Sequence, residues 1–122
     1  MKSTEPVMKL LEQICENDGR YRLEAYTFVL GGLGYTMQRL KRSGHVSGQE
    51  LSEGLREYAI QDYGKMARTV LEHWGIKKTD DFGNIVFSMI EHNLLGKTAH
   101  DSIDDFINQF DFKEAFDAAF PE

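Results

Sequence analysis

Apolar residues recur every three or four positions along most of this chain, a spacing that places them on one face of an α-helix. The first such segment covers about residues 4–17 and ends at the stop signal Asn17-Asp18-Gly19. The second covers about residues 23–41 and ends at Ser43-Gly44. The pattern therefore predicts two amphipathic helices before residue 45.

A third helix has a well-defined start. Ser47-Gly48-Gln49-Glu50 is a capping box, because the Ser47 hydroxyl can accept from the backbone N–H of Glu50 while the Glu50 carboxylate accepts from that of Ser47. Leu51 and Leu55 then begin an apolar stripe. A helix is expected over about residues 47–61.

Two more helices are expected after the joint at Gly64. The fourth covers residues 65–74, and Gly75 follows it as the left-handed residue that commonly ends a helix. The fifth starts at Thr79 or Asp80 and continues to residue 93, because Asp80 and Asp81 suit the positive end of a helix dipole. Residues 45–95 thus form a series of short helices with short joints.

The pattern after residue 94 fits a helix and a strand almost equally well. Phe106 and Phe110 fit a helical stripe with Ile103, whereas with Asn108 they also fit the alternation of a strand. From residue 112 to residue 120 the stripe is helical again. We expect a mainly α fold, a compact bundle of about five to six helices, with a small winged-helix-like β-hairpin near residues 94–112 as an alternative.

Acidic and aromatic residues alternate in the same tail. The acids are Asp101, Asp104, Asp105, Asp111 and Asp117, and the aromatic residues are Phe106, Phe110, Phe112, Phe116 and Phe120. Such a segment can insert an amphipathic helix into the groove of a partner. It can also fold back onto its own core, which avoids exposing five phenylalanines. The sequence leaves open which of these residues 102–120 do.

Composition places the chain among ordinary globular proteins. Its 122 residues, 41% of them hydrophobic, fit a single domain over residues 1–122 with a core of its own. The lone Cys15 excludes an internal disulfide and fits a reducing compartment. No apolar run is long enough to span a bilayer, and the first residues lack a signal core. A cytoplasmic protein without a membrane partner is expected.

The net charge of −6 is unevenly distributed. Residues 1–79 carry a balance of +2 and residues 80–122 one of −8, so the last third is unsuited to phosphate backbones. A winged-helix-like DNA-binding protein remains an alternative. Its nucleic-acid contacts would come from the basic residues of the fourth helix and those just beyond it, which are Lys65, Arg68, Lys77 and Lys78.

The glycine-rich stretch from Leu30 to Thr36 has two interpretations. After a strand it would be a phosphate-binding loop, although the Lys-Ser/Thr pair of that motif is missing. Within a helix, Gly31, Gly32 and Gly34 would allow another helix to cross closely. The helical interpretation is the favoured one.

Other short motifs carry no chemistry. Asp81-Phe82-Gly83 resembles the magnesium motif of protein kinases, but the catalytic loop and lysine strand of those enzymes are missing, so it is interpreted as a helix start. The histidines show no metal-ligand spacing; they are His45, His73, His92 and His100. We therefore expect no catalytic residues, no metal and no cofactor.

Several strings resemble a family of small uncharacterised bacterial proteins. They cover residues 26–30, 45–51, 66–76 and 81–87, and the tail continues the resemblance, which extends from about Tyr21 to Phe116. The family has no assigned activity, so the resemblance implies no catalytic residues. It implies a helix at positions 31–34, where its relatives lack the glycine run.

The leading hypothesis for function is a non-enzymatic protein-interaction or regulatory module with a protein partner. The second alternative, after DNA binding, is a small-ligand-binding protein or enzyme with a pocket near Tyr35 and His45. Candidate binding residues are polar ones without an obvious cap or core role, namely His45, Arg68, His73 and Asn84. Enzymatic activity and oligomeric state are left open.

Overall fold

The amphipathic segments form helices wherever their spacing is regular. The computed structural model of the chain describes residues 5–96 and 102–120, and its elements are α1 (Glu5–Asp18), α2 (Leu23–Leu40), α3 (Gly48–Tyr63), η1 (Gly64–Met66), α4 (Ala67–His73), α5 (Thr79–Glu91), η2 (Ile103–Phe106) and η3 (Lys113–Asp117). For these residues the prediction of a mainly helical bundle is confirmed. The helix start expected at residue 4 lies outside the described residues, as do His100 and Asp101.

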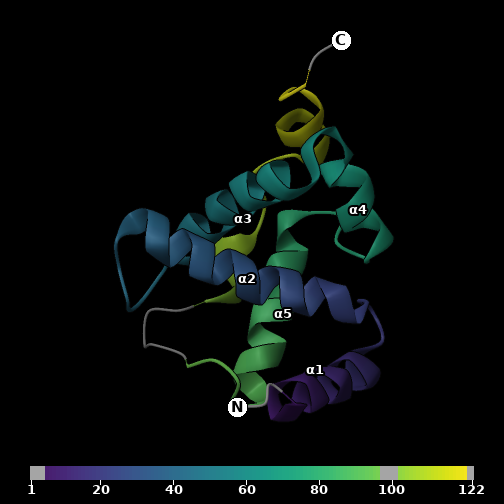
Figure 1. Cartoon of the computed structure of the whole chain (residues 1–122), viewed down its shortest axis with the longest axis vertical. Helices are drawn as coiled ribbons and strands as arrows, with labels where there is room; N and C mark the ends of the chain where they lie inside the picture. The colour runs from purple at the N-terminus through teal and green to yellow at the C-terminus, as the bar shows by residue number, and fades with distance from the viewer. Residues whose placement is uncertain (1–4, 97–101, 121–122) are drawn as a thin grey trace.

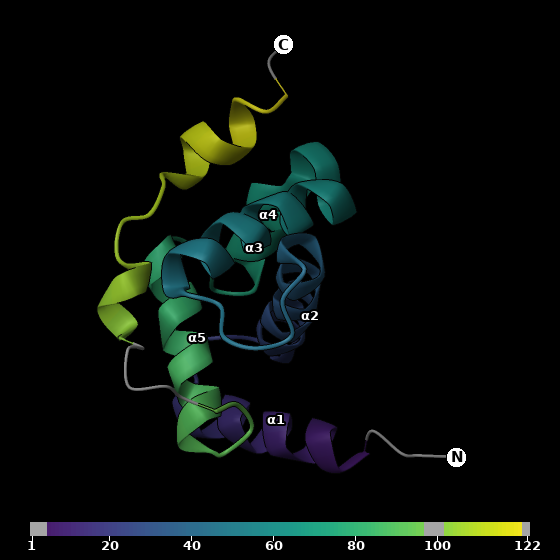
Figure 2. The same ribbon diagram turned by 90° about the vertical axis from the view of Figure 1, so that its left-hand side faces the viewer.

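Helix α5 runs through the middle of the bundle and crosses α2 (Figure 1). It packs against α1, α2, α3 and the short 3-10 helix η2. Helix α1 lies at one end of the molecule, and η3 lies at the opposite end in both views (Figures 1 and 2). None of the helices in the described part of the chain is long and apolar enough to cross a membrane.

The capping box predicted for the third helix is confirmed at the start of α3. Ser47 Oγ accepts from the backbone N–H of Glu50 at 3.0 Å, and Glu50 Oε1 accepts from the backbone N–H of Ser47 at the same distance. Arg42 donates to Glu50 Oε1 at 2.7 Å, and this contact with the cap lowers the pKa of Glu50. The cap therefore also ties the preceding loop to α3.

The predicted boundaries around α4 and α5 are also present. Gly75 has a φ of +97°, and a Cβ there would lie 2.6 Å from the carbonyl oxygen of Arg20, so glycine is needed for two reasons. Asp81 Oδ2 accepts from the backbone N–H groups of Lys77 and Lys78 at 2.8 and 3.2 Å. The acidic stretch is thus a helix start, as interpreted from the sequence.

The phosphate-loop alternative is wrong, because Gly31, Gly32 and Gly34 lie inside α2. Two of these glycines face α3: a Cβ on Gly32 would overlap Leu55, and one on Gly31 would overlap the Tyr58 hydroxyl. Because these glycines have no side chain, α2 and α3 can approach each other closely. The glycine run therefore serves helix packing and not ligand binding.

The C-terminal tail packs on the protein's own core. Phe106, Phe112 and Phe116 are buried, and Figure 2 shows the tail running beside α5 and α3. The buried Thr79 hydroxyl anchors it, because Thr79 Oγ1 donates to the carbonyl oxygen of Phe106 at 2.7 Å and accepts from the N–H of Gln109 at 3.0 Å. The question left open by the sequence is answered for residues 102–120 by this packing.

No β-hairpin forms in the described residues of the range 94–112. Residues 103–106 make a 3-10 turn, and Asn108 has a φ of +50°, a left-handed conformation that interrupts any strand. The N–H of Asn108 donates to the Asp80 carboxylate at 3.3 Å, and its neighbour donates to Thr79, so neither pairs with a second strand. Residues 97–101 of that range lie outside the described part of the chain.

Candidate functional site

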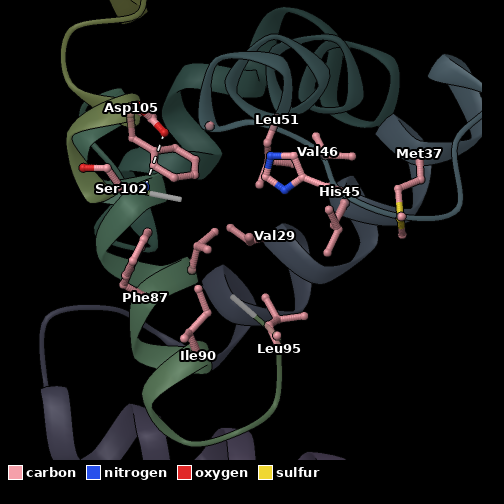
Figure 3. A pocket seen from close by; sticks show the side chains of 16 residues that line it. Val29, Met37, His45, Val46, Leu51, Phe87, Ile90, Leu95, Ser102 and Asp105 are labelled. Carbon is pink, nitrogen blue, oxygen red and sulfur yellow. Dashed lines mark hydrogen bonds between the residues drawn. The ribbon is translucent and has the colours of Figure 1, made fainter. Parts of the chain in front are cut away.

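A pocket of about 380 Å³ opens between α2, the start of α3, α5 and η2 (Figure 3). Most of its lining side chains are apolar and come from three helices and two connecting segments. The lining residues are Val29, Leu33, Met37, Gly44, His45, Val46, Gly48, Leu51, Val86, Phe87, Ile90, Leu95, Gly96, Ser102, Asp105 and Phe106. This is the candidate functional site, and it is called the α2–α5 pocket below.

Helical spacing explains how α2 supplies one wall. Val29, Leu33 and Met37 are four residues apart, so they follow one another along a single face of the helix. Val86 and Ile90 repeat this spacing on α5 and form the facing wall. The two walls come from segments more than 40 residues apart in the chain, and only the crossing of the helices brings them together.

A close approach of η2 to α3 forms the third wall. A Cβ on Gly48 would lie 2.6 Å from Cβ of Asp105 and 3.0 Å from the ring of Phe106. Backbone atoms of the first turn of α3 therefore touch the tail directly. A side chain at Gly48 would push η2 outward and widen the pocket.

Polar groups gather on the η2 side of the α2–α5 pocket. Asp105 is half-buried, and one of its carboxylate oxygens, Oδ2, accepts from the backbone N–H of Ser102 at 3.4 Å. Ser102 Oγ accepts from the N–H of Asp104 at 3.1 Å. These contacts hold the Asp105 carboxylate beside a mostly apolar space, whereas the Ser102 hydroxyl points away from it (Figure 3). The imidazole of His45 also lines the pocket (Figure 3).

The residues predicted as a binding set do not converge on this pocket. Only His45 lines it. Arg68 contacts two carboxylates, Asp117 at 3.0 Å and Glu72 at 3.6 Å, and so connects α4 to the tail. His73 is exposed in the last turn of α4.

Asn84 belongs to a hydrogen-bonded network at the start of α5. Its Nδ2 donates to the Tyr21 hydroxyl at 2.9 Å, and that hydroxyl donates to Asp81 Oδ1 at 2.5 Å. Burial and the hydrogen bond to the Asp81 carboxylate raise the pKa of Tyr21 above its ordinary range. Since Asp81 also caps α5, the network holds that helix against the α1–α2 turn.

The pocket hypothesised near Tyr35 and His45 has only one of these residues in its wall. Tyr35 lies on α2, and its ring packs against Tyr58 of α3 with centroids 5.5 Å apart. It is therefore turned toward the helix crossing and away from the pocket lining. The sequence does not single out the apolar wall residues; the apolar spacing of residues 23–41 is the available signal.

The basic residues proposed for nucleic-acid binding lie in mixed surroundings. Arg68, Lys77 and Lys78 line a shallow hollow of about 360 Å³, and Lys65 does not. Three carboxylates share that lining: Glu72, Asp80 and Asp111. Alternating charge of this kind offers no continuous track for a phosphate backbone.

Comparison with known proteins adds no relative. No protein-family model, no curated protein and no solved structure matches this chain. The resemblance described from the sequence stays a prediction, and no residue role is taken from another protein. In the described residues, no group of three or more His, Cys, Asp or Glu side chains is placed to hold a metal ion.

Proposed function

We propose that this protein is a non-enzymatic binding module that holds a small apolar molecule in the α2–α5 pocket. The observation that carries the proposal is the pocket itself, about 380 Å³ in volume and walled mostly by aliphatic and aromatic side chains. Small-molecule sites in proteins fall at roughly 300–1,000 Å³ and combine such a lining with a few polar groups. The pocket fits this description.

The polar groups at the η2 side indicate how one end of the ligand would be oriented. The Asp105 carboxylate is a hydrogen-bond acceptor. An anionic end would be repelled by Asp105, whereas a hydroxyl, amine or amide would find acceptors there. The proposed ligand class is therefore an apolar molecule with a hydrogen-bond donor at one end.

The protein-interaction hypothesis keeps less support than it had from the sequence. It depended on an aromatic, acidic tail, and the phenylalanines at positions 106, 112 and 116 are packed on the core. It stays a prediction, as does DNA binding. The apolar ligand is favoured because a half-enclosed space surrounded by four segments suits a compact molecule.

Filling the pocket tests the proposal. Leu33→Trp adds an indole to the wall on α2, and Ile90→Trp adds one to the facing wall on α5, so each leaves less room for a ligand. Both variants are expected to reduce the binding of N-phenyl-1-naphthylamine, a neutral apolar dye with one N–H donor, by about 10-fold. The matched control is Leu40→Trp, since Leu40 lies exposed at the end of α2 and lines no part of the pocket.

The readout is the dye's own fluorescence, with helical content checked by circular dichroism. Equal dye binding by the wild type, the two pocket variants and the control contradicts the proposal, as does failure of the wild type to bind. Organic extraction of the purified protein followed by mass spectrometry then identifies the natural ligand. A polar or strongly anionic extract would contradict the ligand class inferred from Asp105.

A further inference from the structure

A smaller hollow, of about 190 Å³, lies between α2, α3 and the end of α4. Four of its six lining residues are aromatic: Phe28, Tyr58, Tyr63 and Trp74. The other two are Glu24 and Thr27, which lie exposed on the first turns of α2. It is called the aromatic hollow below, and it is separate from the α2–α5 pocket because the two share no lining residue.

The four rings pack against one another at the hollow. Phe28 is buried and lies 5.4 Å from Tyr58 and 5.9 Å from Trp74, measured between ring centroids. Tyr63 and Trp74 stand nearly perpendicular, at 82°, with centroids 5.6 Å apart. Tyr58, Tyr63 and Trp74 are half-buried. Ring surfaces in several orientations therefore border one small space.

The charge of the hollow is negative. Glu24 contributes a carboxylate to the lining, and no lysine or arginine of the described residues lines it. Asp62 lies next to Tyr63 in the chain, and burial together with the charge of Asp62 raises the pKa of the Tyr63 phenol. A cation is therefore favoured here by the carboxylates and by the electron-rich faces of the rings.

We propose that the aromatic hollow binds a quaternary ammonium head group. Such a group carries a positive charge for the rings and Glu24, and its methyl groups would bury apolar surface against the half-buried rings of Tyr63 and Trp74. A primary ammonium is strongly hydrated and would lose more on entering an aromatic site. The inference goes beyond the proposed apolar ligand, since it concerns another site and another chemistry.

The protein carries a direct reporter of this site. Trp74 is the sole tryptophan of the chain, so its fluorescence responds to events in the hollow. Titration with choline is expected to change that fluorescence to saturation. The neutral analogue 3,3-dimethylbutan-1-ol, in which carbon replaces the charged nitrogen of choline, is expected to cause no saturable change in fluorescence. Equal responses to the two compounds overturn the proposal, because burial of methyl groups alone would then explain binding.

Two substitutions distinguish the contribution of the Glu24 carboxylate to binding from that of the aromatic rings. Glu24→Gln removes a carboxylate from an exposed position and is expected to weaken choline binding by roughly 3- to 10-fold. Glu12→Gln, on the exposed face of α1, is the matched control and is expected to leave binding unchanged. Tyr63→Leu, followed by calorimetry, is expected to abolish binding. Unchanged affinity in both Glu24→Gln and Tyr63→Leu contradicts the site.

The head group could come from a free solute or from a trimethylated lysine side chain of a peptide. Both carry the proposed chemistry, and titration with choline and with a trimethyllysine peptide distinguishes the two sources by their relative affinity. The unmethylated peptide is the control, and equal binding of that peptide contradicts recognition of the methyl groups. Absence of any response to both methylated probes at millimolar concentration overturns the proposal.

Discussion

At the scale of single residues, Tyr26 has an unusual position. Its side chain is fully buried, and its ring contacts that of Tyr21 edge-on with centroids 6.3 Å apart. Within the described part of the chain, its hydroxyl has no hydrogen-bond partner. A buried polar group without a partner costs free energy that an apolar replacement would not.

Tyr26→Phe is therefore expected to raise the free energy of unfolding by about 1 kcal/mol. Urea denaturation measures the effect. Tyr21→Phe is the matched control and is expected to lower it, because the Tyr21 hydroxyl bonds to Asp81 and Asn84. A loss of stability in Tyr26→Phe would show that the hydroxyl does have a favourable interaction.

The Tyr26→Phe substitution is also expected to change how the free energy of unfolding depends on pH. Burial raises the pKa of Tyr26 to about 12, above the ordinary value of about 10 for a tyrosine. The unfolded chain therefore releases this proton at lower pH than the folded protein, and stability declines as pH rises from about 10 through 12. The wild type is expected to lose stability more steeply over this interval than Tyr26→Phe, as measured by urea midpoints at each pH. Equal slopes would contradict the burial of the phenol.

At the scale of elements, the crossing of α2 and α3 depends on missing side chains. Thr36 is buried on α2, with Oγ1 donating to the carbonyl oxygen of Gly32 at 2.7 Å. A Cβ on Gly54 of α3 would overlap Thr36 Oγ1 and lie 2.8 Å from Thr36 Cβ. Since Thr36 is branched at Cβ, no rotamer clears this space without losing packing or the hydrogen bond.

Gly54→Ala is expected to lower the free energy of unfolding by about 1–3 kcal/mol, because the two helices must separate to admit the methyl group. Gly34→Ala is the matched control within α2: nothing lies within 4 Å of its Cβ position. That substitution is expected to raise stability by about 0.5–1 kcal/mol through helix propensity. Urea denaturation of both variants tests the pair, and equal effects would contradict the close crossing.

The helix boundaries show which local signals can be read from a sequence. The capping box of Ser47 and Glu50 and the helix end at Gly75 can be predicted, because a cap depends on residues within one turn. The conformation of the tail is harder to predict, because the spacing of Phe106 and Phe110 fits both the 3.6-residue period of a helix and the two-residue period of a strand. Its conformation depends on contacts with Thr79 and Asp80, which lie 27 or more residues earlier.

At the scale of the whole molecule, the tail and the helices share one aromatic cluster. Phe116 is almost completely buried, with ring centroids 5.1 Å from Phe112 and 5.9 Å from Phe110, and Phe82 of α5 joins the same cluster. The prediction of a single domain implies that loss of this packing weakens the entire chain. Phe120, by contrast, is exposed.

Phe116→Ala is expected to lower the free energy of unfolding by about 3–5 kcal/mol, the usual cost of truncating a buried phenylalanine. Trp74 fluorescence and circular dichroism should report the same shifted midpoint, because one cooperative unit unfolds at once. Phe120→Ala, the control, should change stability by less than about 0.5 kcal/mol. An unchanged Trp74 transition in Phe116→Ala would show that the tail and the helices unfold separately.

The candidate sites illustrate what sequence reasoning could and could not find. His45 was singled out and lines the α2–α5 pocket, whereas Arg68 and Asn84 are occupied by ion pairs and hydrogen bonds within the fold. Exposed polar residues attract attention in a sequence, but the walls of the α2–α5 pocket are mainly apolar, and four of the six residues that line the aromatic hollow are aromatic. An apolar residue in a pocket wall has the same sequence signal as one in the core.

The helices, the capping box at Ser47 and the break at Gly75 can be predicted from the sequence alone, because they follow from apolar spacing and from hydrogen bonds between residues close together in the chain. The helix crossings, the packing of the tail and both hollows were decided only by the tertiary structure. Val29, Val86 and Phe106 share a cavity although they lie far apart in the chain. Such proximity depends on how whole helices cross, and no local pattern encodes the angle or depth of that crossing.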